Sequence, residues 1–296
     1  MTNYRAGFVT FVGRPNVGKS TLTNALVGEK IAIISDKPQT TRRAVRGIVH
    51  REDGQIIIVD TPGMHRPRTL LGERLNDVVH ATVAEVDVIG FCVPANEPVG
   101  PGDRFINEQL DEAPKARKIA IVTKAETVSR DVLASRLVDV QGLREWDDII
   151  PVSAAEDIQL DTLTGIILGL LPDSEPLYPS DMKTEESFEQ RAAELVREAA
   201  LEGVHDELPH SIAVTVEEIV TRDDGVTREL YVNIVVERDS QKGIIIGRGG
   251  ERLKRIREQA QREISQITEG RVIVSIRVKV AKEWQRDPKQ LGRLGF

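Results

Sequence analysis

The sequence predicts an α/β protein in which a doubly wound, mostly parallel sheet is followed by a smaller α+β unit. Runs rich in Val and Ile alternate with helical patterns up to residue 171, which is typical of parallel strands buried on both faces. A stretch with three prolines then lacks any helical or strand period. Because 296 residues are long for one compact domain, we expect a first domain over 1–171, a linker over 172–183 and a second domain over 184–296.

Six segments of the first domain have the continuous apolar character of buried strands. They are residues 8–12, 45–50, 55–59, 88–93, 119–123 and 149–152. Helical patterns lie between them, at residues 20–27, 70–85, 104–111, 131–140 and 159–171. Residues 51–54 join the second and third strands and end in Asp-Gly, a hairpin signal. We therefore expect one antiparallel pair at an edge of the sheet.

The second domain is expected to have the order α–β–β–α–β. Its first helix covers residues 188–202, where apolar positions keep to one face. Strands follow at 211–220 and 229–236, with a turn at 222–225. The last elements are a helix at 243–267 that begins after a glycine break, a strand at 271–280 and a tail helix at 289–294.

Composition is typical of a soluble globular protein, with 40% apolar and 29% charged residues. Aromatic residues make up only 4%, which disfavours RNA binding by extensive base stacking. The single cysteine, Cys92, lies in an apolar run and is expected to be a buried small hydrophobe in a reducing cytosol. No apolar run is long enough to span a membrane, and the N-terminus leads straight into a strand without room for a signal peptide.

The net charge of −7 is unevenly distributed along the chain. Residues 1–237 carry 25 basic and 40 acidic side chains, a net charge of −15. Residues 238–296 carry 15 basic and 7 acidic side chains, a net charge of +8. A locally uncompensated basic region on an acidic protein indicates an anionic partner for that region.

A phosphate-binding loop is predicted between the first strand and the first helix, where residues 13–20 read G-x-x-x-x-G-K-S. Its glycines let the backbone wrap closely around phosphates, and the helix that follows adds its positive dipole end. Lys19 can reach the β- and γ-phosphates, and the Ser20 hydroxyl can hold Mg²⁺. The nucleotide-binding residues predicted here are Gly13, Arg14, Pro15, Asn16, Val17, Gly18, Lys19, Ser20 and Thr21.

Two further segments are suited to report the presence of a γ-phosphate. Asp60, Thr61, Pro62 and Gly63 follow a strand, so that Asp60 can hold Mg²⁺ through water and the Gly63 amide can meet the γ-phosphate. Between this segment and Ser20 lies a polar loop with paired threonines, Thr40 and Thr41. We expect Thr41, Ser20 and Asp60 to complete the Mg²⁺ site.

These motifs resemble the first three of the translation-factor-class GTPases. The resemblance implies a fifth motif at Ser153, Ala154 and Ala155, whose backbone would contact the guanine carbonyl. It also implies Asn-Lys-x-Asp as the fourth motif, but the chain has Thr123, Lys124, Ala125 and Glu126 there.

The altered fourth motif bears on base selection. The family's Asp accepts hydrogen bonds from guanine, a pattern that adenine lacks. Glu126 keeps the carboxylate but adds a methylene, Lys124 can still pack over the ring, and Thr123 replaces an amide that would tie this loop to the phosphate loop. We expect guanine preference to be weakened but kept. The alternative is a nucleotide-sensing RNA-binding protein with weak or no hydrolysis, and a P-loop kinase or ATPase is disfavoured by the segment Asp60–Gly63.

Hydrolysis is expected to be slow, because Met64 stands where Ras-like switches have a Gln that orients water. Asn16 and the paired threonines resemble potassium-assisted GTPases, in which K⁺ near the phosphates replaces an arginine finger. The resemblance thus implies K⁺ near Asn16 and the loop 35–41. The residues predicted to act in catalysis are Lys19, Thr41, Gly63 and Asn16.

A second anion-binding loop is predicted in the basic region. The sequence Gly247-Arg248-Gly249-Gly250 forms a G-x-x-G loop after Ile246, and the backbone there can approach a nucleic acid closely. Glycine pairs also cap many helices, but this one lies in the basic α+β unit. Arg248, Lys254 and Arg255, with Arg257 and Arg262 beyond them, extend the positive surface. The unit resembles a type II KH domain.

A GTPase domain followed by a KH domain resembles the Era family over nearly the whole chain. The resemblance implies a cytoplasmic, slow GTPase that binds GTP or GDP with Mg²⁺. It further implies binding to the 3′ end of small-subunit rRNA, assistance to small ribosomal subunit maturation, and peripheral association with the cytoplasmic face of the cell membrane. We expect a monomer. The sequence itself contains no lipidation motif or clear amphipathic anchor.

Overall fold

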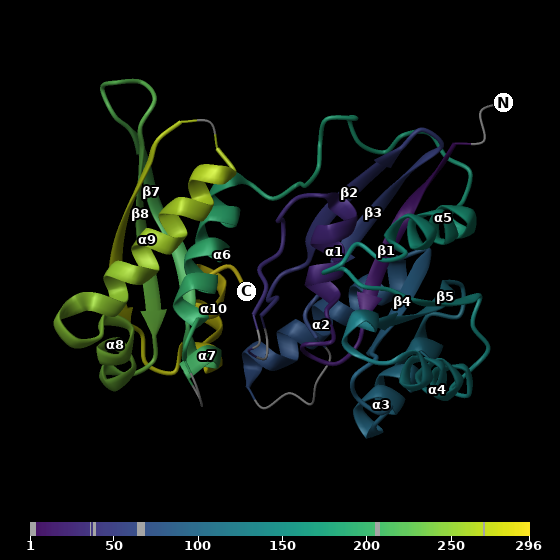
Figure 1. The fold of residues 1–296 in the computed structure, drawn as a ribbon. Coiled ribbons are helices and arrows are strands. Elements are labelled where there is room, and N and C mark those ends of the chain that lie inside the picture. Colours follow the sequence, from purple (N-terminus) through teal and green to yellow (C-terminus); the bar gives the residue numbers. More distant parts are fainter. Residues whose placement is uncertain (1–3, 36, 38–39, 64–68, 205–207, 269) are drawn as a thin grey trace. The chain divides into compact units, whose positions relative to one another are not determined.

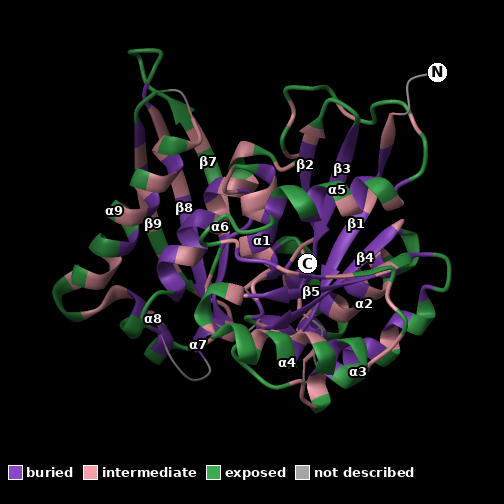
Figure 2. Ribbon diagram, turned by 45° about the vertical axis from the view of Figure 1, so that its right-hand side comes forward, coloured by how far each residue is buried: buried purple, intermediate pink, exposed green. Residues whose placement is uncertain are grey.

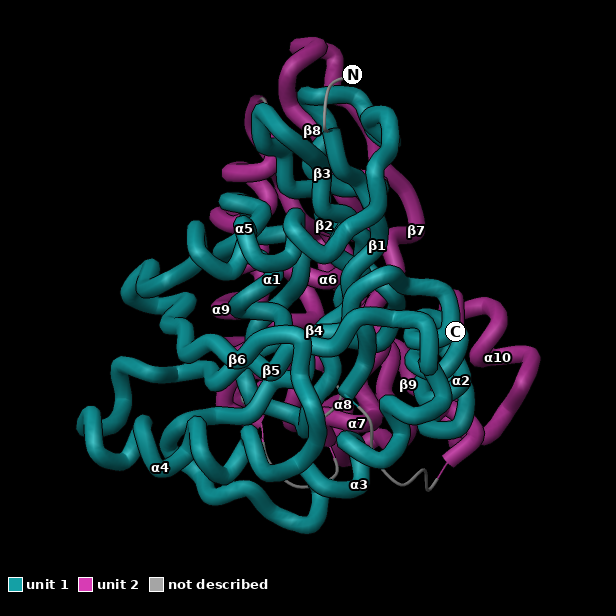
Figure 3. Tube along the Cα trace, turned by 90° about the vertical axis from the view of Figure 1, so that its right-hand side faces the viewer, with its two compact units in different colours: residues 1–34, 41–67, 72–185 teal, residues 35–40, 68–71, 186–296 magenta. Residues whose placement is uncertain are grey.

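The computed structural model describes residues 4–35, 37, 40–63, 69–204, 208–268 and 270–296. The described chain divides into two compact units, which have different colours in Figure 3. The first contains the described residues of 1–34, 41–67 and 72–185. The second contains those of 35–40, 68–71 and 186–296.

The first unit is built on a six-stranded sheet in the order β2-β3-β1-β4-β5-β6 (Figure 1). Its strands are β1 (Arg5–Val12), β2 (Val45–Arg51), β3 (Gly54–Asp60), β4 (Val88–Pro94), β5 (Arg117–Thr123) and β6 (Asp148–Pro151). The edge strand β2 is antiparallel to its neighbour, and the other pairs are parallel. The predicted doubly wound sheet and its antiparallel edge pair are therefore confirmed.

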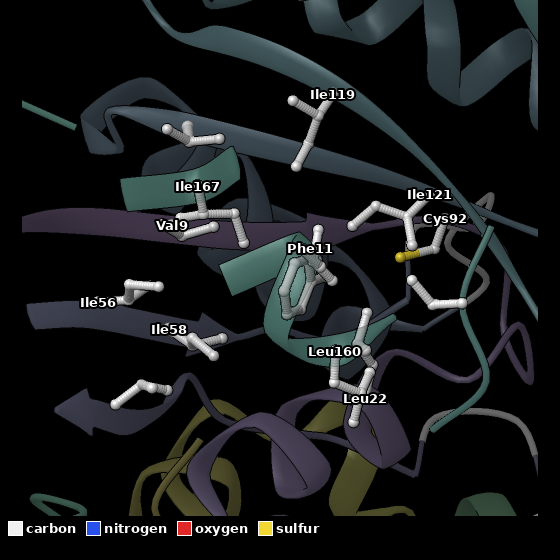
Figure 4. Packing of buried hydrophobic residues seen from close by; sticks show 14 of the residues in the cluster. Val9, Phe11, Leu22, Ile56, Ile58, Cys92, Ile119, Ile121, Leu160 and Ile167 are labelled. Atoms are coloured by element: carbon white, nitrogen blue, oxygen red, sulfur yellow. The ribbon is translucent and has the colours of Figure 1, made fainter. Parts of the chain in front are cut away.

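Helices cover both faces of this sheet. One apolar cluster joins the sheet to α1 (Lys19–Val27) and α5 (Leu160–Leu170), and Figure 4 shows Phe11, Leu22 and Leu160 within it. The other joins it to α2 (Leu70–Glu85), α3 (Pro101–Gln109) and α4 (Arg130–Gln141). Cys92 is fully buried in the first cluster, as predicted, and burial raises the pKa of its thiol to about 12.

Helix α3 begins three residues earlier than the predicted segment 104–111. Pro101 stands at its first turn, where a missing N–H costs nothing, and Asp103 accepts a hydrogen bond from the Gly100 amide at 2.8 Å. Pro101 and Asp103 thus place the start of α3 before the predicted segment 104–111.

Residues 172–185 belong to the first unit, where they are bonded to its strands. Gln55 of β3 is 1% exposed, and its Oε1 accepts hydrogen bonds from the amides of Leu177 (2.8 Å) and Tyr178 (3.0 Å). Its Nε2 donates to the Tyr178 carbonyl at 2.6 Å and contacts His50 Nδ1 at 3.2 Å. Further along, the Ile48 amide donates to the Lys183 carbonyl. The buried side-chain amide of Gln55 thus holds residues 172–185 in place, although their prolines predict an irregular segment.

The second unit has a three-stranded sheet in the order β7-β8-β9, with β7/β8 antiparallel and β8/β9 parallel. The strands are β7 (Ala213–Thr221), β8 (Arg228–Val236) and β9 (Val272–Val280). The helices are α6 (Phe188–Leu201), α7 (Leu208–Ser211), α8 (Asp239–Ile246), α9 (Glu251–Gln266) and α10 (Pro288–Arg293).

The predicted single helix at 243–267 is wrong. Two helices, α8 and α9, are separated by the 3₁₀ turn η3 (Arg248–Gly250), and Gly243 lies inside α8. A glycine within a helix costs only about 1 kcal/mol, so Gly243 can lie inside α8 without ending the helix. The break falls at Gly247, Gly249 and Gly250, whose φ angles of 74°, 60° and 81° end helical geometry. Counting the short α7 before β7 and the terminal α10, the order is therefore α–α–β–β–α–α–β–α.

Helix α9 buries a narrow apolar stripe. Ile256, Ala260 and Ile264, four residues apart, are 0–3% exposed, while Arg257, Glu258 and Arg262 between them are exposed. The ribbon of α9 accordingly carries the colours of both buried and exposed residues in Figure 2. Trp284 is also fully buried and donates to the Ser211 carbonyl at 3.1 Å. Within the described parts of the chain, no helix combines the length and apolarity needed to cross a membrane.

Candidate nucleotide site and RNA-binding cleft

The phosphate-binding loop connects β1 to α1 with an unusual backbone. Gly13 must be glycine because a Cβ there would lie 2.5 Å from the Cys92 carbonyl oxygen. Asn16 and Gly18 have left-handed φ angles of 65° and 100°. Left-handed residues next to ordinary ones create backbone concavities that bind anions. The loop therefore has the geometry of a phosphate cradle.

Lys19 is the charged centre of this loop. It is only 7% exposed, and its Nζ donates to the carbonyls of Gly13 and Arg14, each at 3.1 Å. Burial lowers the pKa of the Lys19 ammonium, and the nearby Asp60 carboxylate opposes that effect. An ammonium held by two neutral carbonyls in a buried place is well suited to receive a phosphate.

The three predicted metal ligands lie together. Ser20 Oγ lies 2.8 Å from Asp60 Oδ2 and 3.0 Å from Thr41 Oγ1, and Thr41 Oγ1 lies 3.2 Å from Asp60 Oδ2. The other carboxylate oxygen, Asp60 Oδ1, is buried without a hydrogen-bond partner among the described residues. Burial raises the pKa of Asp60, while Ser20, Lys19 and Thr41 counteract the shift. One carboxylate and two hydroxyls are hard oxygen ligands that fit Mg²⁺.

The segment after Asp60 follows the phosphate loop closely. A Cβ on Gly63 would lie 3.4 Å from Lys19 Nζ, so the Gly63 backbone is next to the ammonium. Thr61 and Pro62 are buried. The Thr40 hydroxyl donates to the Lys37 carbonyl at 2.6 Å. Met64, on which the expectation of slow hydrolysis rests, lies outside the described residues.

The fourth motif is bonded directly to the phosphate loop. Thr123 is 4% exposed, and its hydroxyl donates to the Val17 carbonyl at 2.6 Å. Lys124 has a left-handed φ of 57°, and its Nζ donates to the Asn16 carbonyl at 2.8 Å. The tie that an asparagine amide would make in the family's motif is therefore made here by the hydroxyl of Thr123.

The fourth and fifth motifs are also joined. The Ala125 amide donates to the Val152 carbonyl at 3.1 Å, just before Ser153. Ser153 is fully buried, and its Oγ accepts a hydrogen bond from the Glu156 amide at 3.0 Å. Ala154 is half-buried, and Ala155 and Glu126 are exposed. The backbone of both loops is thus fixed, while the Glu126 carboxylate remains accessible.

The other predicted loop residues differ in their surroundings. Val17 is buried in the apolar core. Arg14 directs its guanidinium to Asp103. Pro15 and Thr21 are half-buried, and Asn16 is exposed.

The G-x-x-G loop lies at the junction of α8 and α9. Arg248 and Gly249 are exposed, while Ile246, Gly247 and Gly250 are half-buried. A Cβ on Gly247 would lie 2.7 Å from Arg252 Cβ, so the loop and the first turn of α9 are in tight contact. The basic side chains of Lys254 and Arg255 are exposed on α9.

A cleft of about 450 Å³ lies next to this loop. Residues from the loop and α9 form one side, and residues from the three strands form the other. The lining residues are Gly250, Leu253, Lys254, Arg257, Glu217, Tyr231, Val232, Ser275, Ile276 and Arg277. Glu217 accepts hydrogen bonds from Asn233 Nδ2 (3.1 Å) and Lys279 Nζ (3.4 Å), and the Asn233 bond is the main cause of its lowered pKa.

Sequence reasoning named three of these lining residues: Gly250 and Lys254 among the proposed RNA contacts, and Arg257 as part of the positive surface beyond them. Arg257 lies one turn beyond Leu253 and Lys254 on α9, whereas Arg255 does not line the cleft. The strand residues carried no local signal, because they reach the cleft only through the pairing of β7, β8 and β9.

Taken together, the fold and the two sites define a class. A phosphate loop, a Ser–Thr–Asp cluster beside it and a base-recognition loop on one parallel sheet make a P-loop GTPase, here with a type II KH unit on the same chain. Residues 8–125 match the family model of the "50S ribosome-binding GTPase", and residues 207–285 match that of the "KH domain".

Comparison of the whole chain is more specific. The GTPase Era of Leifsonia xyli subsp. xyli is 64% identical over the full length of both chains. That of Streptomyces coelicolor is 56% identical, covering 100% of this chain and 96% of the relative. A crystal structure of Era with MgGDPNP and nucleotides 1506–1542 of 16S ribosomal RNA has a TM-score of 0.95 at 36% identity, covering 99% of each chain. A point variant of Aquifex aeolicus Era bound to GDP·AlF4⁻ has a TM-score of 0.94, also at 36% identity, covering 98% of this chain and 99% of that one. The chain belongs to the Era family of GTPases.

Thr123→Val tests the tie between the fourth motif and the phosphate loop. The substitution keeps the side-chain shape but leaves the buried Val17 carbonyl without its donor, so we expect GDP to dissociate about tenfold faster. Release of a fluorescent GDP analogue measures the rate. Thr82→Val removes a similar hydroxyl-to-carbonyl bond in α2 and serves as the control. An unchanged rate in Thr123→Val would show that the tie has no part in nucleotide binding.

Proposed function

We propose that this GTPase binds the single-stranded 3′ end of small-subunit rRNA through its KH unit and assists maturation of the small ribosomal subunit. The observation that carries the proposal is the cleft beside the G-x-x-G loop, with Lys254 and Arg257 on one side. The solved relative that contains a 16S rRNA segment has the same fold over 99% of each chain.

For the nucleotide, we propose that Lys19 binds the β- and γ-phosphates and that Ser20, Thr41 and Asp60 hold Mg²⁺. The unpartnered Asp60 Oδ1 supports this role, because a buried carboxylate oxygen is costly unless something binds it. A bound Mg²⁺ neutralises the charge that builds up on the phosphates. The Gly63 backbone lies beside Lys19 and is therefore well placed to respond when the γ-phosphate leaves.

For the base, we propose that Glu126 accepts hydrogen bonds from guanine while Lys124 packs over the ring. The bonds from Thr123 and Lys124 to the phosphate loop support a rigid base-recognition loop. Glu126 itself is exposed, so its longer side chain can adjust its reach. Ser153, Ala154 and Ala155 would meet the guanine carbonyl.

For the RNA, we propose that phosphates lie along Arg248, Gly249 and the basic face of α9. The other side of the cleft carries the Glu217 carboxylate, which repels phosphate but is paired with Lys279, and it also carries Arg277. Base edges are better suited to that side, where Ser275 offers a hydroxyl and Glu217 an acceptor.

The remaining proposals follow from family membership. We propose a monomer that acts in the cytoplasm and associates peripherally with the cytoplasmic face of the cell membrane. The alternative of a nucleotide-sensing protein with little or no hydrolysis is not favoured for a member of a GTPase family. K⁺ near Asn16 and the loop 35–41 stays a prediction.

Glu126→Ala tests base selection. Without the carboxylate, the hydrogen bonds from guanine are lost, and we expect the preference for GTP over ATP to fall about tenfold or more. Glu126→Asp should raise the preference, because it restores the shorter side chain. Competition of GTP, ATP and XTP against a fluorescent GDP analogue measures the ratio. Equal binding of GTP and ATP by the unchanged protein would contradict the role of Glu126.

Exchange of K⁺ for Na⁺ tests potassium assistance. If K⁺ stabilises the transition state, the hydrolysis rate should fall about tenfold or more in Na⁺. Asn16→Ala should then show little difference between the two ions. Phosphate release under saturating GTP measures the rates, and equal rates of the unchanged protein in both salts would rule out a role for K⁺.

Arg257→Ala and Arg255→Ala together test the RNA cleft. Arg257 lines the cleft and Arg255 does not, so we expect the first substitution to weaken RNA binding about tenfold and the second much less. The salt slope should fall by about 0.7 when one phosphate contact to a single strand is lost. Fluorescence anisotropy with a labelled 3′-end rRNA segment measures both. Equal losses would contradict the cleft as the site, and equal binding of a scrambled RNA would contradict the rRNA target.

A further inference from the structure

Arg14 lies in the phosphate loop, yet its side chain is held by acidic groups at the start of another helix. Its Nε donates to Asp103 Oδ1 at 2.7 Å, and its Nη2 donates to Glu97 Oε2 at 3.0 Å. Asp103 belongs to α3, and its side chain is fully buried, whereas Glu97 is half exposed. Since the two nitrogens go to two different carboxylates, the guanidinium has a fixed orientation.

The Asp103 carboxylate is itself held in place. Its Oδ2 accepts the Gly100 amide at 2.8 Å, at the start of α3, and its Oδ1 accepts Arg14. A buried carboxylate is costly without a counterion, and Arg14 supplies that charge. The link therefore joins two stiff structures, the phosphate loop and the first turn of α3.

A third contact fixes the stem of Arg14. A Cβ built on Gly102 would lie 2.8 Å from Arg14 Cδ and 3.4 Å from its Cγ, so the arginine stem lies directly on the Gly102 backbone. The Arg14 side chain is therefore held by contacts at both its guanidinium and its aliphatic stem. Gly102 has an ordinary helical position, and the absence of a side chain there is explained by this close approach.

The backbone of the same residue holds the functional lysine. The Arg14 carbonyl accepts a hydrogen bond from Lys19 Nζ at 3.1 Å. Because the side chain and carbonyl of one residue share a Cα, fixing the side chain limits where the carbonyl can point. We propose that Arg14 is a positioning residue: Asp103, Glu97 and Gly102 hold it so that its carbonyl aims the Lys19 ammonium into the phosphate site, and its own guanidinium does not bind phosphate.

Nucleotide release tests this assignment. Arg14→Ala removes the grip, and Gly102→Ala displaces the arginine stem without changing any charge. We expect each to speed GDP release about tenfold, since small misplacements of a reacting group are costly. Arg14→Lys should recover only part of the loss, because an ammonium cannot serve both carboxylates in the same geometry. Arg144→Ala is the matched control, because Arg144 holds the other end of α3 through Asn107 Oδ1 at 2.7 Å.

Three outcomes would overturn the proposal. If Arg14 bound phosphate directly, Asp103→Asn and Gly102→Ala would free it and leave release unchanged or slower. If the Arg14–Asp103 ion pair only stabilised the fold, Arg144→Ala would lower the melting temperature and speed GDP release as much as Arg14→Ala does. If the groups acted independently, the double variant Arg14→Ala/Asp103→Asn would be clearly worse than Arg14→Ala alone. If Arg14→Ala does not fold, Gly102→Ala and Glu97→Gln test the proposal in its place. We expect Glu97→Gln to speed GDP release slightly.

Discussion

A buried ammonium group, that of Lys19, is the constraint on which the nucleotide site depends. Removing a charge from water is expensive, and the direct hydrogen bonds of Lys19 go to the carbonyls of Gly13 and Arg14. Dipoles of neutral carbonyls stabilise an ammonium less than a phosphate would. The buried lysine is thus suited to bind phosphate, and the Gly13 and Arg14 carbonyls fix the position of its ammonium.

The phosphate loop that surrounds Lys19 is stabilised from outside. Its left-handed residues are not intrinsically preferred, and carbonyls exposed by such a backbone need donors. Thr123 and Lys124, at the end of β5, supply donors to Val17 and Asn16. This explains how a threonine can stand where the fourth motif of translation-factor-class GTPases has an asparagine. The requirement is a donor within reach of the Val17 carbonyl, and a hydroxyl meets it.

Features that depend on local pattern could be predicted from the sequence, and features that depend on tertiary approach could not. Strand β3 is buried along its whole length, as its run of isoleucines indicates. Helix α6 begins at Ser187, whose side chain accepts from the Gln190 amide. By contrast, the role of Gln55 in fixing residues 172–185 depends on partners more than 100 positions away. A buried glutamine in a strand has no local mark that reveals those partners.

The same distinction separates the two candidate sites. Most of the phosphate loop is contiguous, so its spacing alone predicts both the fold around it and its ligand. The RNA cleft combines one contiguous loop with Glu217, Tyr231 and Ser275, which come from three different strands. Which strand residues line the cleft depends on the register of the strands. A register error of one residue would turn the side chains of a strand to the other face of the sheet. Sequence could therefore predict that RNA binds near Gly247–Gly250 but not which side chains it meets.

Both sites nevertheless use the same physical device, a helix that begins without a side-chain cap. Helices α4, α6 and α10 begin at Ser129, Ser187 and Asp287, whose side chains accept the free backbone amides of the first turn. Helices α3, α5 and α8 also lack such a bond, but only α1 and α9 among the helices with a described N-cap combine its absence with a left-handed glycine at the N-cap, Gly18 and Gly250. In α9 the Glu251 amide donates to the Arg248 carbonyl, but no side chain caps the first turn of either helix, and the positive end of a helix favours an anionic acceptor. A capping side chain at either glycine would occupy the amides that a phosphate needs, in addition to straining the backbone. The glycines at these two positions are therefore better explained by what they leave unbonded than by flexibility.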